Sequence, residues 1–231
     1  DEMTVTATGN ARSAFEAPMM VSVIDASAPE KQTANSAADL LRNVPGLMLD
    51  GTGRTNGQDV NLRGYDRRGV LVLVDGVRLN SSRTDSRQLD SIDPFNIDHI
   101  EVISGATSLY GGGSTGGLIN IVTKKGQPET MMEFEAGTKS GFSSSKDHDE
   151  RIAGAVSGGN EHISGRLSVA YQKFGGWFDG NGDATLLDNT QTGLQYSDRL
   201  DIMGTGTLNI DESRQLQLIT QYYKSQGDDD Y

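Results

Sequence analysis

The stretch that decides the fold is residues 98–125, DHIEVISGATSLYGGGSTGGLINIVTKK. Ile100 and Val102 alternate with polar residues, which predicts a strand that turns at Gly105, and residues 118–122 predict a second strand. Glycine reaches backbone conformations closed to other residues and lets neighbouring backbone approach closely. We therefore expect the chain to press against something large at the glycines between the strands, which are Gly111, Gly112, Gly113, Gly116 and Gly117.

A glycine-rich loop can also cradle phosphate, so a nucleotide site is the first alternative. A phosphate-binding loop of the GxxxxGK[ST] type needs a lysine after its last glycine. Here Gly117 is followed by Leu118. The sequence therefore does not favour a nucleotide site.

The composition excludes several classes of protein. Asp and Glu number 32 against 20 Lys and Arg, giving a net charge of −12, which argues against a nucleic-acid partner. No cysteine is present, so neither a disulfide framework nor a thiolate metal site is expected. No apolar run reaches the roughly 18 residues of a membrane-spanning helix. The sequence opens on Asp1 and Glu2 without a basic and apolar leader, so if the protein is exported we expect this to be the mature form.

Two further segments predict scaffold elements upstream of the glycine-rich stretch. In residues 39–47, DLLRNVPGL, a helix capped by Ser36 with Asp39 at its third residue is expected to stop at Pro45 and Gly46. In residues 61–79, NLRGYDRRGVLVLVDGVRL, the apolar run predicts a strand covered on both faces, followed by an Asp-Gly turn.

From residue 131 onward the sequence changes to long stretches of alternating polar and apolar residues. Met132 and Phe134 alternate with Glu133 and Glu135, and the same period of two recurs downstream, predicting five strands. One apolar and one polar face suit lipid outside and a wet lumen inside. A soluble antiparallel sheet would show the same alternation. Residues 179–183, DGNGD, resemble the start of a calcium loop but lack its later ligands, so a turn-rich surface loop is expected.

In their order and spacing, the three segments 39–47, 61–79 and 98–125 resemble the plug domain of TonB-dependent outer-membrane receptors. The resemblance implies an α+β plug, a small mixed sheet with short helices, followed by the first antiparallel strands of a transmembrane β-barrel. It divides the chain into a TonB box and lead-in (1–10), a plug (11–126) and about five strands of a truncated barrel (127–231). Such a fragment cannot close a barrel, so we expect it to transport nothing alone and to expose open sheet edges.

The resemblance also implies which residues meet partners. The TonB box, which would add as a strand to the protein TonB, is Met3, Thr4, Val5, Thr6 and Ala7. The alternative for this segment is a disordered lead-in. The plug loop that would touch ligand carries Asn80, Ser81, Ser82, Arg83 and Arg87, and its alternative is a plain surface loop.

A plug-to-barrel lock is a third implied site. Arg63, expected inside a strand that ends at Gly64, would pair with acidic residues of the barrel wall, for which Glu133 and Glu135 are the candidates. The alternative is a solvated arginine. Many family members carry Arg and Pro beside the turn glycine, where this chain has Ser104 and Ala106, which removes one possible ion pair.

The ligand implied is a ferric siderophore, because residues 79–231 resemble receptors for ferric aerobactin. Residues 1–78 resemble the plug of haem receptors, yet residues 79–97 hold no histidine that could ligate haem iron. The expected partners are TonB, the chelate and outer-membrane lipid, with no cofactor because the ligand carries the Fe³⁺, and with no metal site in the protein.

Other functions stay open at this point. They are a haem receptor of the same family, a binding-only fragment used by bacteriocins or phage, and a signalling receptor, which would need a domain ahead of the TonB box. No Ser, His and carboxylate lie at a catalytic spacing, so no enzyme is expected.

Overall fold

The structure is a computed structural model in which the chain divides into two compact units, Asp1–Thr123 and Lys124–Tyr231. It describes residues 4–5, 12–13, 20–27, 34–50, 59–65, 69–78, 89, 91–105, 114–185, 195–211 and 214–227. Within those ranges, no helix is both long and apolar enough to cross a membrane.

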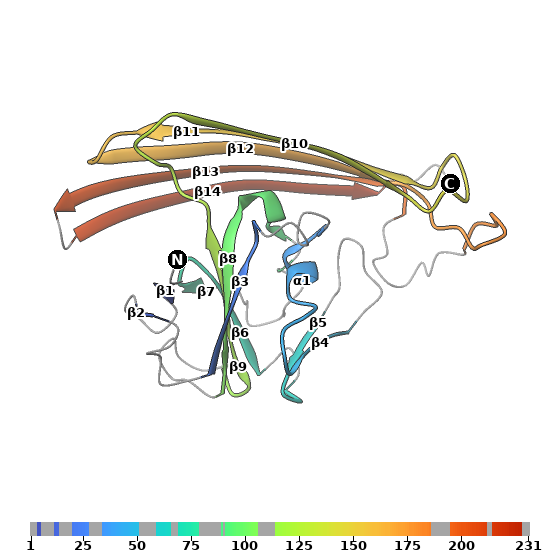
Figure 1. Cartoon of the computed structure of the whole chain (residues 1–231), viewed down its shortest axis with the longest axis horizontal. Coiled ribbons are helices and arrows are strands. Elements are labelled where there is room, and N and C mark those ends of the chain that lie inside the picture. The colour runs from blue at the N-terminus through green and yellow to red at the C-terminus, as the bar shows by residue number, and fades with distance from the viewer. Residues whose placement is uncertain are drawn as a thin grey trace. The chain divides into compact units, whose positions relative to one another are not determined.

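The first unit is built on a five-stranded mixed sheet (Figure 1). Within this sheet only β6 (Val70–Val74) and β9 (Gly117–Thr123) run parallel, while the other neighbours are antiparallel. Two smaller two-stranded sheets complete it, β4 (Leu47–Asp50) with β5 (Asp59–Leu62) and β1 (Thr4–Val5) with β2 (Arg12–Ser13). In spatial order the main sheet is β3 (Met20–Asp25), β8 (Ile97–Ser104), β9 (Gly117–Thr123), β6 (Val70–Val74) and β7 (Val77–Arg78).

Strand β6 is covered on both faces, as its unbroken apolar run predicts. Val70 and Val72 belong to the larger hydrophobic cluster, and Leu71 and Leu73 to a smaller one on the opposite side. Because successive side chains of a strand point to opposite faces, the two clusters lie on the two sides of the sheet.

Helix α1 (Ala37–Leu40) begins where the sequence predicts and ends earlier. The Asp39 backbone N–H donates to Ser36 Oγ at 3.3 Å, and the Asp39 carboxylate accepts the Asn35 N–H at 2.9 Å. The helix ends at Leu40, with Leu41 as its C-cap, rather than at Pro45, and turns follow it. Leu40, Leu41 and Val44 are all buried in the main cluster. A short 3₁₀ helix, η3 (Pro94–Asn96), precedes β8 and is capped by Asp93.

The glycines at the start of β9 are pressed against their own unit. A Cβ on Gly117 would lie 2.4 Å from the Ile103 carbonyl oxygen and 2.5 Å from Leu62 Cδ2. A Cβ on Gly116 would lie 2.5 Å from Tyr65 Cβ. At Gly116 and Gly117 the large neighbour expected from the sequence is therefore the rest of the first unit, namely β8, β5 and the turn after β5. Gly111, Gly112 and Gly113 lie outside the described residues.

The second unit is one antiparallel sheet whose strands follow each other in sequence order (Figure 1). The predicted number of five is confirmed for the described residues. In the sequence, the strands are separated by residues 141–147, 160–162, 175–196 and 212–213. The strands are β10 (Met131–Ser140), β11 (His148–Gly159), β12 (Ile163–Phe174), β13 (Ser197–Asp211) and β14 (Arg214–Gly227).

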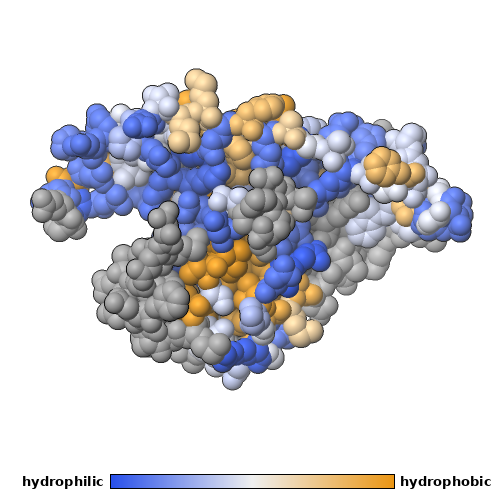
Figure 2. Space-filling view, viewed as in Figure 1, coloured by the Kyte–Doolittle hydropathy of each residue, from blue (hydrophilic) through white to orange (hydrophobic). Residues whose placement is uncertain are grey.

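The two faces of this sheet differ as the alternation predicts. Phe134, Gly154, Val169, Ile202 and Tyr222 lie opposite one another across the five strands, so they share one face. Figure 2 shows apolar side chains at the surface of this sheet among hydrophilic ones. The apolar face includes Met132 (80% exposed), Phe134 (74%), Ile152, Val156, Leu167, Val169, Leu208, Ile210, Leu216 and Leu218. The polar face includes Glu133, Glu135, Arg151, Arg166, Gln172 and Arg199.

The loop at residues 179–183 is a closed turn. Asp179 Oδ1 accepts the backbone N–H groups of Asn181 and Asp183, both at 2.9 Å. Among the described residues, no group of three or more His, Cys, Asp or Glu side chains is placed to hold a metal ion. The turn interpretation fits this geometry.

Candidate functional site

The TonB-box candidates lie at the start of the described chain. Thr4 and Val5 form β1 and pair with Ser13 and Arg12 of β2. Met3, Thr6 and Ala7 lie outside the described residues. Thr4 and Val5, in the middle of the candidate TonB box, are thus extended, and strand addition needs an extended backbone.

The ligand-loop candidates Asn80, Ser81, Ser82, Arg83 and Arg87 all lie outside the described residues. The segment that carries them starts directly after β7. Its role as a ligand site stays a prediction.

Arg63 does not lie inside a strand, which corrects the expectation from sequence. It follows β5 in a turn with φ of 52°, and Gly64 follows with φ of 83°. Its backbone N–H donates to the Gly46 carbonyl at 2.8 Å, and Asn61 Oδ1 accepts the Gly64 N–H at 3.0 Å. The side chain is exposed. The sequence misleads here because an arginine rarely adopts the left-handed conformation that this turn imposes.

Glu133 and Glu135 lie on the polar face of the second unit, as the register predicts. Glu133 bonds to Lys124 Nζ at 2.7 Å and to Arg166 Nη2 at 3.0 Å. Glu135 bonds to Arg151 Nε at 2.6 Å. Both acids therefore have cationic partners within their own unit, and a pairing of either with Arg63 stays a prediction.

A row of polar side chains crosses the same face and was not predicted. Arg151 Nη1 and Arg199 Nη2 both donate to Gln172 Oε1, at 3.4 Å and 2.8 Å. The Arg199 guanidinium also lies 5.6 Å from the centre of the Phe174 ring. A planar guanidinium can stack on an aromatic ring while its edge donates hydrogen bonds. Register alone could have found the row, since these residues lie opposite one another on β11, β12 and β13.

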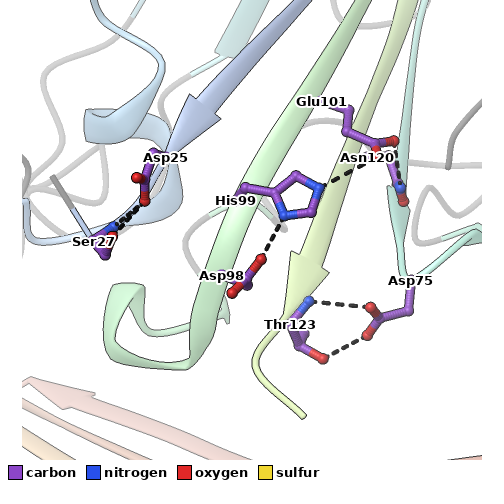
Figure 3. Close-up of polar contacts among 8 residues, drawn as sticks. All are labelled: Asp25, Ser27, Asp75, Asp98, His99, Glu101, Asn120 and Thr123. Atoms are coloured by element: carbon purple, nitrogen blue, oxygen red, sulfur yellow. Dashed lines mark hydrogen bonds and ion pairs between the residues drawn. The ribbon is translucent and has the colours of Figure 1, made fainter. Parts of the chain in front are cut away.

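A second unpredicted arrangement lies in the first unit, where the start of β8 meets the end of β9 (Figure 3). Asn120 Nδ2 donates to Glu101 Oε2 at 3.0 Å, and Asn120 Oδ1 accepts the Gly76 N–H at 3.0 Å. Asp75 accepts the Thr123 backbone N–H at 3.1 Å and the Thr123 hydroxyl at 2.6 Å. Glu101 is 0% exposed and Asn120 is 1% exposed. Buried polar groups are tolerated when they are bonded in this way.

His99 supplies the positive charge of this arrangement. Its Nδ1 lies 2.6 Å from Asp98 Oδ2 and its Nε2 lies 3.4 Å from Glu101 Oε1. Burial lowers the pKa of His99, but the hydrogen bonds and charges of Asp98 and Glu101 outweigh it and raise the pKa to about 9. On the neighbouring strands, Asp25 of β3 and Val122 of β9 lie opposite His99.

This shift predicts a loss of stability in alkali. The folded pKa of His99 exceeds its usual 6.5, so the stabilisation is fully present below pH 6.5 and is lost as pH rises through about 9. The loss amounts to no more than about 3 kcal/mol. Urea unfolding of His99→Gln should therefore depend less on pH between neutral and alkaline buffer than unfolding of the wild type. His162→Gln, at an exposed position in the other unit, should keep the wild-type dependence. Identical profiles for wild type and His99→Gln would contradict this assignment.

Comparison with known proteins matches both units to one class. Residues 13–118 match the family model "TonB-dependent Receptor Plug Domain". The ferric aerobactin receptor of Klebsiella pneumoniae is 88% identical over 83% of this chain and 26% of that protein. The hemin receptor of Yersinia pestis is 40% identical over 97% of this chain and 32% of that protein. The crystal structure of the siderophore receptor PirA from Acinetobacter baumannii superposes with a TM-score of 0.67 at 29% identity, covering 89% of this chain and 31% of that chain.

A plug followed by strands with one apolar and one polar face is the architecture of an outer-membrane receptor. The chain belongs to the TonB-dependent receptors, of which it carries the plug domain and five strands of the wall. It spans about a quarter to a third of the length of the curated relatives it matches. Receptors for ferric aerobactin and for hemin are both found among the relatives, as the sequence predicts. The match to the Klebsiella protein covers 192 residues, so it extends beyond the stretch from 79 to 231 in which the resemblance to aerobactin receptors was seen.

Proposed function

We propose that this chain is part of a receptor that takes up a ferric siderophore of the citrate–hydroxamate class, such as ferric aerobactin, across the outer membrane. The observation that carries the proposal is the 88% identity to a ferric aerobactin receptor over most of the chain. The receptor would bind and move its ligand without making or breaking a covalent bond. The ligand brings the Fe³⁺, so the protein needs no cofactor of its own.

The segment after β7 is the proposed contact with the chelate. An anionic, oxygen-rich chelate suits the guanidinium groups of Arg83 and Arg87, which form charge-assisted bonds to carboxylates. Asn80, Ser81 and Ser82 add neutral donors. Residues 79–97 contain no histidine, which favours such a chelate over haem.

TonB is the proposed source of movement. Residues 3–7 would add as a strand to TonB, using main-chain hydrogen bonds that do not depend on the side chains. In the part of the chain that the structure describes, β1 and β2 pair over two residues each, and a contact of that length could exchange for a pairing with TonB. A lock between Arg63 and the acids Glu133 and Glu135 would hold the plug until it is pulled.

The second candidate is haem uptake within the same family. It is favoured by the 40% identity to the hemin receptor of Yersinia pestis, which covers nearly the whole chain. Haem would need an axial ligand for its iron, and the histidines of this sequence are His99, His148 and His162. His99 is already held between two carboxylates in the plug.

A graft separates the two candidates. Residues 1–231 replace the matching segment of the Klebsiella pneumoniae receptor, and the hybrid is expressed in cells that lack their own receptors for both ligands. We expect uptake of radiolabelled iron from ferric aerobactin and no growth on haem as the iron source. Arg83→Ala combined with Arg87→Ala should weaken chelate binding by about tenfold or more. Arg42→Ala, which removes an exposed arginine paired with Asp39 in its own turn, is the matched control. Growth on haem without aerobactin uptake would overturn the proposal.

A further inference from the structure

The polar side chains at the end of the plug sheet join parts of the chain that are far apart in sequence (Figure 3). We name them the clasp: Asp75, His99, Glu101, Asn120 and Thr123. They come from the turn between β6 and β7, from β8 and from β9. The contacts that cross between these elements link residues 19 to 48 positions apart.

Glu101 fixes the orientation of the Asn120 amide. The Asn120 NH₂ group must face Glu101 Oε2, because the alternative would place its carbonyl oxygen against a buried carboxylate. The carbonyl oxygen is then directed to the Gly76 N–H. His99, between Asp98 and Glu101, supplies the charge that keeps Glu101 satisfied in the interior.

The turn at Asp75 and Gly76 is bound to β9 at several points. Both residues have left-handed backbone, with φ of 46° and 79°. The Asp75 N–H donates to the Ile121 carbonyl at 2.9 Å, the Gly76 N–H donates to Asn120, and the Asp75 carboxylate holds Thr123. Thr123 is the last residue of the first unit, and β7 leads directly into residues 79–88.

We propose that the clasp holds the β6–β7 hairpin and the end of β9 together as one rigid body. The chain that enters residues 79–88 and the chain that leaves the plug at Thr123 then move together. The part of this inference that concerns the chelate rests on the proposed function, in which residues 79–88 contact it. Glu101 and Asn120 are then positioning residues, which act through the turn and touch no ligand themselves.

Hydrogen exchange at two amides tests the clasp without any ligand. The Gly76 N–H and the Thr123 N–H are bonded to different members of the clasp, Asn120 and Asp75. In the grafted receptor held in detergent, Glu101→Ala should speed exchange at both amides by about tenfold or more, because opening frees the hairpin and the strand end together. Glu101→Gln, which keeps an acceptor for Asn120, should change both amides by less than about threefold.

Two comparisons keep this test decisive. Ser27→Ala is the matched control, since it removes a hydrogen bond to Asp25 beside the clasp but outside it, and should leave both amides unchanged. Should Glu101→Ala not fold, Asp75→Ala opens the clasp from its other end and should again speed exchange at both amides. Faster exchange at Gly76 alone, or at neither amide, would overturn the clasp.

A second measurement tests the coupling to ligand. Saturating ferric aerobactin should slow exchange at the Thr123 amide of the wild-type graft, and the slowing should be absent in Glu101→Ala. If the chelate binds, as shown by quenching of tryptophan fluorescence, and Thr123 does not respond, the coupling is refuted. If the chelate does not bind the graft at all, the proposed function fails. The exchange rates measured without ligand still show whether the clasp holds the hairpin and the strand end together.

Discussion

Proline in place of Val5 is expected to stop energy-driven uptake while leaving chelate binding unchanged. Strand addition to TonB depends on main-chain hydrogen bonds, and proline removes a backbone N–H and fixes φ. In the grafted receptor, uptake of radiolabelled iron should fall by at least about tenfold. Binding of ferric aerobactin to cells without metabolic energy should stay within about twofold, because the proposed contacts with the chelate lie in residues 79–88 instead.

A conservative change at the same position is the control. Val5→Ile keeps the backbone donor and the preference for extended structure, so uptake should be preserved. The β1–β2 pairing also contains Val5, and Val5→Ile keeps the backbone groups of that pairing. Undiminished uptake by Val5→Pro would show that residues 3–7 are not the segment that TonB engages.

Aspartate in place of Asn120 should destabilise the plug by about 3–5 kcal/mol, which is the range for an uncompensated buried charge. Asn120 Nδ2 now donates to Glu101 Oε2 at 3.0 Å, and both side chains are almost fully buried. The variant would remove this donor and place a second carboxylate against the first. Like charges at such a distance raise the apparent pKa of the pair, so the penalty should be largest at neutral and alkaline pH and shrink on acidification.

Urea unfolding followed by circular dichroism measures this effect. Asn160→Asp is the matched control, because Asn160 is exposed and its Oδ1 accepts the His162 and Ile163 N–H groups, which a carboxylate also can do. It should change stability by less than about 0.5 kcal/mol. An unchanged unfolding midpoint for Asn120→Asp at neutral pH would mean that Glu101 and Asn120 do not meet in the folded plug.

The sheets were predictable because their signals are local. The apolar run of β6 and the Asp-Gly turn after it determine a buried strand and a tight hairpin within seven residues. The period of two in β10 to β14 assigns each side chain to a face, which placed Glu133 and Glu135 correctly. Arg63 was misplaced because its turn depends on Gly64 and on a contact with Gly46, neither of which alternation reveals.

The clasp could not be found from the sequence for a different reason. Glu101 occupies the polar position of an alternating strand, which predicts exposure, yet it is fully buried. Its burial is stable because Asn120 and His99 satisfy it, and the Asn120 contact forms only when β8 pairs with β9. Pairings between distant strands determine such networks, and a single sequence gives no direct signal for them.

The apolar face of the second unit also determines which bilayer suits this protein. On β13 that face runs from Leu200 to Ile210 and is bounded by Asp198 and Asp211. At about 3.3 Å per residue and a tilt of about 40°, this length corresponds to a height of about 25 Å. An average hydrocarbon core is about 30 Å thick, so hydrophobic mismatch would force ordinary lipids to compress beside this wall. The wall is therefore matched to the thin bacterial outer membrane, and thicker vesicles would be a poor host for reconstitution.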